Sequence, residues 1–408
     1  MDAAFREATR GLEDRERSWA RECTFGALRH RGRLDHILDS HLHRGLDSVD
    51  APVLELLRLG AYQILRMDGV PAYAAVSQTV EQVRSLEGRH LTGLVNGVLR
   101  AVQRRGEDVT LFADRTRNPL EFLASWHSHP PWLVERWLER WPAAAVEQLL
   151  EANNRIPPVY LRPLGVAEED ARQALGPGAR SAGKGSGCVQ LPPGTTPPAA
   201  LAAVRGIIQD PAAALVTRYA DVPSGWRVAD LCAAPGGKAV ALSEDAAYLV
   251  ASDRSLGRLG RLKETVERLG IRIGLVVADA TAPPLRMVRA VVLDVPCSGT
   301  GTLRRHPDLK WRLEPPDLES LVMLQRAILE GAAPLVPAGG LLVYSTCTLE
   351  PEENEEQVEA FLGQHPDFRL EATDAVAADL LDSGGALRVL PHLTGFDGAY
   401  AARLRRVG

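Results

Sequence analysis

The sequence predicts an all-α domain followed by an α/β domain with a doubly wound, mostly parallel sheet. Two observations support this prediction. Up to about residue 140, apolar residues recur every three to four positions, the spacing of amphipathic helices. From about residue 206, short apolar runs alternate with longer helical patterns, as in strands joined by crossover helices. We therefore expect three regions, at 1–140, 141–205 and 206–408, the middle one being a linker with a small α+β region.

Three segments of the first region carry the helical prediction. Residues 53–65, 74–83 and 91–105 each place apolar side chains at helical spacing. Pro71 precedes the second segment and favours a helix start, and Gly106 follows the third. No β-rich segment interrupts them, so this region is predicted to be all-α.

The middle region begins where the helical pattern breaks. Residues 153–158 contain two asparagines and two prolines, a composition typical of a linker. Beyond it we expect strands at 159–162 and 188–191 with a helix at 168–175 between them. Glycine-rich stretches separate these short elements and predict loops.

The last region has five short apolar runs, each followed by a polar or small-residue turn. In a parallel sheet ligands bind at the carboxyl ends of the strands, so the residues after these runs are the place to look for chemistry. The predicted strands are 227–231, 247–251, 273–277, 290–293 and 341–344.

Composition excludes several classes of protein. Apolar residues make up 45% of the 408 residues and charged residues 24%, as expected for a soluble globular protein. The five cysteines form no CxxC pair, so neither a zinc site nor a disulfide framework is predicted, and no metal is expected. We find no signal peptide and no apolar run near the ~20 residues of a membrane span. A cytoplasmic location without membrane attachment is expected.

Net charge does not by itself indicate a nucleic-acid binder. The formal charge is −5, although only four of the 47 basic residues are lysines. Arginine suits bidentate phosphate contacts and stacking on bases. An arginine-rich genome explains the same bias, so the arginine content decides nothing.

Residues 230–238 (DLCAAPGGK) connect the first predicted strand to a helix. Small residues and a glycine pair at such a turn allow the backbone to approach a ligand closely. The next two strands end in carboxylates, Asp253 and Asp279. Asp253 is placed to accept hydrogen bonds from a ribose diol, and Asp279 from an adenine amine.

Two nucleotide-binding motifs do not fit this loop. A P-loop requires glycine five positions before Gly237, where Cys232 stands, and Ser or Thr where Ala239 stands. A GxGxxG fingerprint is also absent. The loop favours a ligand with an adenosine end and no phosphate chain, and the alternative is a tight turn without a ligand.

Two cysteines follow the fourth and fifth strands. Cys297 lies three residues after Asp294, and Cys347 follows directly after Thr346. A thiolate that adds to C6 of cytosine breaks the ring's aromaticity and makes C5 nucleophilic, which is covalent catalysis. Asp294 is the candidate acid or hydrogen-bond partner near N3 or N4 of the base. The alternative is that both cysteines are buried packing residues, and residue order alone does not decide which sulfur would react.

These motifs closely resemble those of the Sun/Nop/Fmu family of RNA (cytosine-C5) methyltransferases, in particular its RsmB-like branch, which acts on small-subunit ribosomal RNA. The resemblance covers nearly the whole chain. Its motifs appear at 230–238, 253–259, 294–298, 304–311 and 346–355. The first region resembles a NusB-type RNA-binding domain at 59–65, 70–76 and 93–100. One departure is 397–400, where the family commonly has Asp-Gly-Phe-Phe and this chain has Asp-Gly-Ala-Tyr, so local repacking is expected.

The resemblance implies a Rossmann-like class I methyltransferase domain after the NusB-like domain, with S-adenosyl-L-methionine as cofactor. It implies that Cys347 is the nucleophile and that Cys297 assists release of the methylated base. The substrate would be RNA, as small-subunit (16S) ribosomal RNA or an early ribosomal subunit, and we expect a monomer. The cofactor residues implied are Cys232, Ala233, Ala234, Pro235, Gly236, Gly237, Lys238, Asp253, Arg258, Asp279 and Asp294.

Basic residues after the Pro-Cys motif are candidates for RNA contacts. Arg304, Arg305 and Lys310 are expected to hold phosphates around a splayed-out cytosine, and Trp311 either stacks on a base or packs in the core. A solvated charged turn is the alternative for the arginines.

Two other functions remain open at this point. A catalytically silent RNA-binding assembly factor would use the helical domain and keep the sheet as a scaffold. A DNA methyltransferase would use Cys297, because DNA cytosine methyltransferases place their nucleophile in the Pro-Cys motif.

Overall fold

The computed structural model describes residues 2–407, which divide into two compact units. The helical unit runs to Arg155 and also includes Leu303–Arg312; the α/β unit comprises Ile156–Thr302 and the chain from Leu313 onward. The helical unit therefore extends past the predicted bound of 140. The extension is helix α9 (Ala143–Asn154), whose Val146, Leu149 and Leu150 are fully buried.

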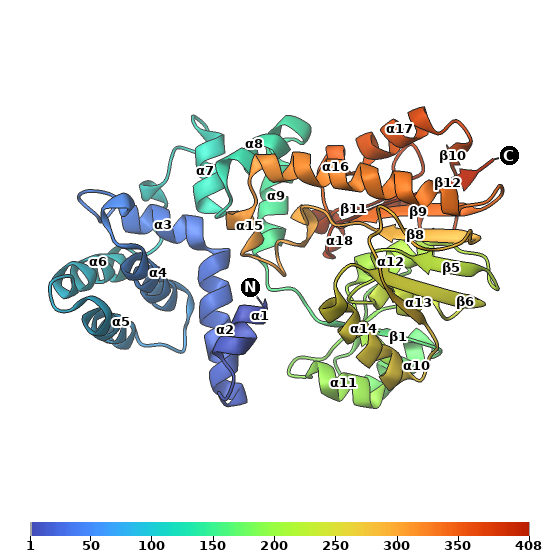
Figure 1. The fold of residues 1–408 in the computed structure, drawn as a ribbon. Helices are drawn as coiled ribbons and strands as arrows, with labels where there is room; N and C mark the ends of the chain where they lie inside the picture. The colour runs from blue at the N-terminus through green and yellow to red at the C-terminus, as the bar shows by residue number, and fades with distance from the viewer. Residues whose placement is uncertain (1, 408) are drawn as a thin grey trace. The chain divides into compact units, whose positions relative to one another are not determined.

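The helical unit is built from helices joined by turns and loops (Figure 1). The predicted helices 53–65, 74–83 and 91–105 are confirmed as the cores of α4, α5 and α6. Its helices are α1 (Asp2–Ala8), α2 (Asp14–Arg29), α3 (Arg31–Asp39), α4 (Ala51–Arg66), α5 (Ala72–Glu87), α6 (Thr92–Arg105), α7 (Pro119–Trp126), α8 (Pro131–Arg140), α9 and α15 (Leu309–Arg312), with 3₁₀ turns η1 (Leu46–Ser48) and η2 (Val109–Leu111).

Helix α4 shows how the sequence pattern builds this core. Val53, Leu57 and Ala61 are four residues apart, lie on one face and are 0% exposed. Gly60 lies beside them, and a Cβ there would come within 2.7 Å of the Thr79 hydroxyl on α5. The glycine is therefore needed for the close approach of α4 and α5.

A small antiparallel sheet opens the α/β unit. Its strand order is β2-β3-β1-β4, and helices α10 (Glu168–Leu175) and α11 (Pro197–Ala203) accompany it. The predicted helix and both predicted strands are confirmed, whereas β2 and β4 were not predicted. The strands are β1 (Tyr160–Pro163), β2 (Arg180–Ser181), β3 (Val189–Gln190) and β4 (Gly206–Ile208).

The main sheet confirms the predicted fold class. Its order is β10-β12-β9-β8-β5-β6-β7, with β11 also paired to β12. The five predicted strands are β5 to β9, and all pairs among them are parallel. Strand β12 joins the β9 edge in antiparallel fashion. The strands are β5 (Arg227–Asp230), β6 (Tyr248–Asp253), β7 (Gly274–Val277), β8 (Ala290–Asp294), β9 (Leu341–Thr346), β10 (Phe368–Leu370), β11 (Leu387–Val389) and β12 (Ala399–Arg406).

Helices cover both faces of this sheet. They are α12 (Pro211–Ala220), α13 (Gly237–Leu242), α14 (Leu256–Leu269), α16 (Pro315–Ala332), α17 (Glu355–Gln364) and α18 (Pro391–Thr394), with 3₁₀ turns η3 (Thr300–Thr302), η4 (Ala333–Leu335), η5 (Pro351–Glu353) and η6 (Ala378–Leu380).

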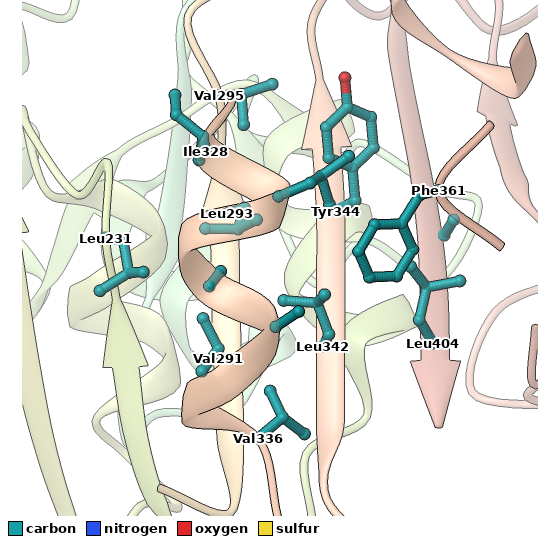
Figure 2. Close-up of a cluster of buried hydrophobic side chains, with 14 of the residues drawn as sticks. Leu231, Val291, Leu293, Val295, Ile328, Val336, Leu342, Tyr344, Phe361 and Leu404 are labelled. Atoms are coloured by element: carbon teal, nitrogen blue, oxygen red, sulfur yellow. The ribbon is translucent and has the colours of Figure 1, made fainter. Parts of the chain in front are cut away.

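Alternation along the strands divides the core between the two faces. On one face Val291 and Leu293 of β8 pack with Ile328 of α16 and Phe361 of α17, as Figure 2 shows. The residue between them, Val292, points to the other face, where α13 and α14 pack. Continuous apolar strands are what a sheet buried on both faces requires.

The chain order creates a crevice at the centre of the sheet. Strand β5 pairs with β6 on one side and with β8 on the other, so the strand order reverses at β5. In doubly wound sheets ligands bind at such a reversal, outside the carboxyl ends of the strands. Within residues 2–407, no helix has the length and apolarity needed to cross a membrane.

Candidate active site

A cavity of about 260 Å³ opens at the carboxyl ends of β5, β6 and β8. The structure brings together here most of the residues that the sequence predicted for the site. It also adds Leu324 and Ile328 of α16, which the sequence analysis did not identify. The predicted residues in its wall are Cys232, Ala234, Pro235, Asp253, Arg258, Asp279, Asp294, Cys297 and Cys347.

The glycines of the 230–238 loop are required by the protein's own packing. Gly236 has a φ of +111°, and a Cβ there would lie 2.2 Å from Cδ1 of Leu262 on α14. A Cβ on Gly237 would lie 2.9 Å from Nε2 of Gln209. From the sequence, the glycine pair was expected to allow close approach to a ligand. The structure supplies a second reason, since α14 and Gln209 occupy the space that side chains would need.

Two carboxylates lie at the outer end of this cavity. Asp253 is buried, and its Oδ1 accepts a hydrogen bond from the backbone N–H of Ser255 at 2.8 Å. Its Oδ2 lies 3.5 Å from the guanidinium of Arg258, which also donates to the Ala234 carbonyl and so braces the loop. Asp279 is exposed, and hydrogen bonds from Thr281 lower its pKa.

Lys238 and Asp294 form an ion pair at the boundary of the cavity. Nζ of Lys238 lies 2.7 Å from Oδ2 of Asp294, and the Ser345 hydroxyl donates to Oδ1 at 3.3 Å. Burial alone would lower the pKa of Lys238, but Asp294 outweighs it and the pKa is raised. The lysine therefore keeps its charge. From the sequence, Lys238 was expected only as a residue of the cofactor loop, and its contact with Asp294 was not predicted.

Asp230 lies behind that pair and is 0% exposed. Neither carboxylate oxygen has a hydrogen-bond partner of good geometry, although the nearby backbone N–H of Cys232 slightly favours the charged form. Burial first, and the Asp294 carboxylate second, raise the pKa of Asp230 to about 7. A buried carboxyl group without a partner is costly, which makes this residue a candidate for function.

The two sulfurs are in direct contact. Sγ of Cys297 lies 3.2 Å from Sγ of Cys347, and the backbone N–H of Cys347 donates to Sγ of Cys297 at 3.3 Å. The hydrogen bond to Cys347, and then burial, raise the pKa of Cys297 well above its usual value. Cys297 is therefore held in its protonated form.

A buried polar network fixes the loops that carry these cysteines. The Glu353 carboxylate accepts from the backbone N–H of Ser298 at 2.9 Å, from the Ser298 hydroxyl, and from Nε2 of Gln325 at 2.8 Å. The Ser298 and Thr348 hydroxyls lie 2.6 Å apart. Burial raises the pKa of Glu353. Glu353 lies within the 346–355 motif, but its role in holding the two loops together was not predicted.

The 397–400 departure is accommodated close to Cys347. Gly398 donates its backbone N–H to the Gly301 carbonyl at 2.7 Å, and Gly301 donates to the Cys347 carbonyl at 3.0 Å. Ala399 and Tyr400 are both buried at the start of β12. The phenol ring therefore remains in the core beside a small residue.

The prediction that Lys310 contacts RNA is wrong for this structure. Lys310 is 1% exposed, within the helical unit, and its Nζ donates to the Arg29 carbonyl at 2.9 Å, the Ser128 carbonyl at 3.0 Å and Oδ1 of Asn154 at 2.8 Å. All three N–H donors of the ammonium are thus used internally.

The neighbours of Lys310 are also largely packed. Arg304 is 5% exposed, which contradicts its prediction as a surface phosphate contact, and its carbonyl accepts from Arg29. Nε1 of Trp311 donates to the Leu28 carbonyl at 2.7 Å, so Trp311 packs rather than stacks on a base. Arg305 is half-buried and stays a candidate.

The other three cysteines lie apart from the two sulfurs that are in contact. Cys23 and Cys188 are buried, and burial raises their pKa values to about 11 and about 12. Cys232 borders the cavity, and burial raises its pKa as well. Over the described part of the chain, no group of three or more His, Cys, Asp or Glu side chains is arranged to hold a metal.

Three family models match separate parts of the chain. Residues 221–405 match the family described as 16S rRNA methyltransferase RsmB/F, and residues 1–104 match the NusB family. Residues 129–163 match the ferredoxin-like domain of RsmF/B-like methyltransferases.

Two relatives are similar to this chain over nearly their full length. The probable ribosomal RNA small subunit methyltransferase B of Synechocystis sp. is 34% identical, over 97% of this chain and 92% of that protein. The ribosomal RNA small subunit methyltransferase B of Yersinia pseudotuberculosis is 33% identical, over 99% of this chain and 94% of its own.

Solved structures support the fold. The crystal structure of PH0851 matches with a TM-score of 0.79 at 24% identity, over 98% of this chain and 93% of that chain. A methyltransferase homolog protein from Pyrococcus horikoshii matches with a TM-score of 0.58 at 22% identity, over 71% of this chain and 99% of its own.

Proposed function

Because the chain belongs to the 16S rRNA methyltransferase RsmB/F family, we propose that it methylates C5 of a cytosine in small-subunit ribosomal RNA, with S-adenosylmethionine as methyl donor and Cys347 as covalent nucleophile. The observation that carries the proposal is the 3.2 Å contact between Cys297 and Cys347 at the rim of the carboxylate-lined cavity. Neighbouring parallel strands β8 and β9 deliver the two sulfurs to the same edge of the sheet.

The cavity suits the proposed cofactor by its chemistry. Carboxylates of Asp253, Asp279 and Asp294 face a space of about 260 Å³, a setting that favours a cationic ligand with hydroxyl and amine donors. Leu324 and Ile328 supply an apolar wall for a flat ring. When bound, S-adenosylmethionine supplies an electrophilic methyl group on a sulfonium sulfur.

Cys347 performs the covalent step. Its sulfur loses a proton and adds to C6 of the cytosine, and the electron pair displaced from the ring makes C5 nucleophilic. After C5 has gained the methyl group, the C5 proton leaves to a base, the C6–S bond breaks and the sulfur departs as thiolate. Ring aromaticity is restored by that elimination.

Cys297 assists both the attack by the Cys347 sulfur and its later departure. Its raised pKa keeps the S–H intact, so this S–H can donate to the sulfur of Cys347, which lies 3.2 Å away. A donor at this position stabilises a thiolate before attack and again when the sulfur departs. The same protonated state disfavours Cys297 as the attacking group.

Lys238 and Asp294 act on the base itself. Negative charge reaches N3 and the O2 edge as the sulfur adds, so a nearby ammonium stabilises the adduct, and the Asp294 carboxylate can accept a hydrogen bond from the N4 amine. Their 2.7 Å ion pair fixes both groups before the base arrives. This positioning is the preorganisation that electrostatic catalysis requires.

Two cysteine variants test the nucleophile. We expect Cys347→Ala to abolish tritiated methyl transfer to an unmodified small-subunit ribosomal RNA transcript, while circular dichroism stays that of the wild type. Cys297→Ala should still react with the RNA and accumulate a protein–RNA adduct that survives denaturing gels, because release is impaired.

The opposite pattern, with the adduct in Cys347→Ala, would assign the nucleophile to Cys297. Methyl transfer to a matched DNA at a higher rate than to RNA would refute the RNA substrate. Bisulfite sequencing of ribosomal RNA from cells with and without the gene identifies the target cytosine. We further propose that the protein acts as a monomer, which light scattering of the free chain checks.

A further inference from the structure

A second cavity, of about 450 Å³, lies beside the first, and apart from Asp294 and the 233–238 loop, which includes Lys238, its lining has no role in the chemistry described above. It is bounded by β4, by the 233–238 loop and by α14. Asp294 and Pro235 line both cavities, so the second cavity begins where the first one ends. Its size lies within the usual range for ligand pockets, about 300–1,000 Å³.

Positive charge is concentrated at its α14 wall. Arg261 and Arg268 are exposed, stand seven residues apart on one helix face and both line the cavity. Arg261 forms no ion pair with any residue in the part of the chain that the structure describes. Arg268 donates one N–H to the Gly206 carbonyl at 2.9 Å and keeps its other donors. Two arginines at this spacing fit successive oxygens of a sugar-phosphate backbone.

A buried, unpartnered acid faces the same space. Asp230 is 0% exposed, lines the cavity, and has no well-formed hydrogen bond at either oxygen. Nε2 of Gln209 also lies at this wall, packed against Gly237. The carboxyl group lacks a donor from the protein, and a ligand hydroxyl would supply one. Leu201 and Ile207 add apolar surface for a base.

We propose that this second cavity binds the nucleotide next to the target cytosine in the RNA strand, with its phosphate at Arg261 and Arg268 and its ribose 2′-hydroxyl at Asp230. The inference rests on the proposed function, because the target base must lie against Lys238 and Asp294 for its neighbour to reach this space. The cavity thereby gives the enzyme a contact that distinguishes RNA from DNA beside the reacting base.

Charge variants on α14 provide the first test. Arg261→Gln in the full chain should raise KM for the ribosomal RNA transcript about tenfold with kcat unchanged. The slope of log KM against the logarithm of the salt concentration should fall by about 0.7, the value for one phosphate contact in a single strand. Lys263→Gln is the matched control, because Lys263 lies on the same helix, is exposed, and does not line the cavity.

The affinity for S-adenosylmethionine, measured by calorimetry, should be the same in both variants. Equal KM values and salt slopes for Arg261→Gln and Lys263→Gln would overturn the assignment, and so would a fall in kcat or in cofactor affinity for Arg261→Gln alone. If the wild type itself transfers no methyl group to RNA, the proposed function fails instead, so the two failures are distinguishable.

A single 2′-deoxy substitution tests the role of Asp230. Placed at the nucleotide on one side of the target cytosine, it should raise KM several-fold for the wild type and leave KM unchanged for Asp230→Asn, since the partner is already altered. If the deoxy substitution, placed on either side of the target, changed KM equally for the wild type and for Asp230→Asn, then Asp230 would not bind the 2′-hydroxyl. Cofactor affinity again reports whether Asp230→Asn is correctly folded.

Discussion

The ion pair between Lys238 and Asp294 shows how single residues are tuned by their surroundings. The lysine ends the glycine loop and the aspartate ends β8, so two separate motifs meet at one 2.7 Å contact. Removing either partner leaves the other as an unpaired charge in a confined space. The two side chains therefore act as one unit.

Variants of this pair should be non-additive. We expect Asp294→Asn and Lys238→Met each to lower kcat by about 100-fold, the lower end of the range for acid–base groups. The double variant should be little slower than either single one, because each change already breaks the pair. Single-turnover methyl transfer measures this, and effects that multiply would show that the residues act independently.

Asp230 makes stability depend on pH. Its pKa is raised from 3.8 to about 7 in the folded state, so the folded chain holds a proton that the unfolded chain releases between these values. Stability from this group is therefore lost as pH rises from about 4 to about 7 and is constant above that. Asp230→Asn removes the effect.

We expect the stability difference between Asp230→Asn and wild type to shift in favour of the variant by about 3 kcal/mol from pH 5 to pH 8, from 1.36 kcal/mol for each of the two pH units between pH 5 and the pKa of about 7. Hydrogen exchange of β5 peptides, corrected for intrinsic rates, reports the unfolding free energy of this unit. A difference that does not change with pH would mean that Asp230 is ionised throughout this range.

Single residues could be predicted from the sequence where a motif places them at the end of a strand. They could not be predicted where their burial depends on residues far away in the sequence. Cys297, Cys347 and Asp294 follow strands, and parallel pairing brings strand ends together. Lys310 looks like a surface charge in the sequence. Its acceptors come from Arg29 and Ser128, which no local pattern connects with it.

Among the elements, helix α15 is stabilised mainly by hydrogen bonds that its side chains donate to the helical unit. It has four residues, too few to be stable alone, and Lys310 and Trp311 provide its hydrogen bonds to the helical unit. Burial, and then the charge of Arg29, lower the pKa of Lys310 well below its usual value, whereas three oxygen acceptors favour the charged form.

Lys310→Met should destabilise the helical unit by about 3 kcal/mol, because it leaves three buried acceptors without a donor. Hydrogen exchange of α2 and α9 peptides measures the loss. Lys263→Met is the control at an exposed site, where a change within about 0.5 kcal/mol is expected. Equal effects of the two substitutions would show that the buried contacts of Lys310 contribute nothing.

Strand prediction followed the apolar pattern and missed elements that lack it. The five parallel strands are buried on both faces and form continuous apolar runs. Strand β12 contains three alanines and three arginines, and Arg403 within it is buried beside Asp221 and Glu371. Its pairing with β9 compensates for a sequence of low strand propensity. Strands β2 and β4 are too short for any periodicity.

For the whole molecule, the helical unit is discontinuous in sequence. Leu303–Arg312 belongs to it, although the chain on both sides of this segment belongs to the α/β unit. Sequence analysis divides a chain into consecutive regions, so it could not predict this exchange. The family and the site were recognisable because motifs are local, and the segment boundaries were not.

A fragment ending at Arg155 should be incomplete. Without 303–312 the carbonyls of Arg29, Ser128 and Leu28 lose their donors. We expect fragment 1–155 to melt several degrees below the unit in the full chain, and a synthetic 301–313 peptide in excess to raise its melting temperature. A Lys310→Met peptide should raise it less. No response to either peptide would show that the segment is dispensable.

Ribosomal synthesis imposes an order on these events. When Arg155 leaves the exit tunnel, Leu303 has not yet been made, and at 5–20 residues per second the wait is about 7 to 30 s. For that period the carbonyls of Arg29 and Ser128 in the nascent helices lack the donor that Lys310 provides. The helical unit is therefore complete only after the Pro-Cys loop of the α/β unit has been synthesised. Completion of the helical unit thus depends on synthesis of the catalytic unit.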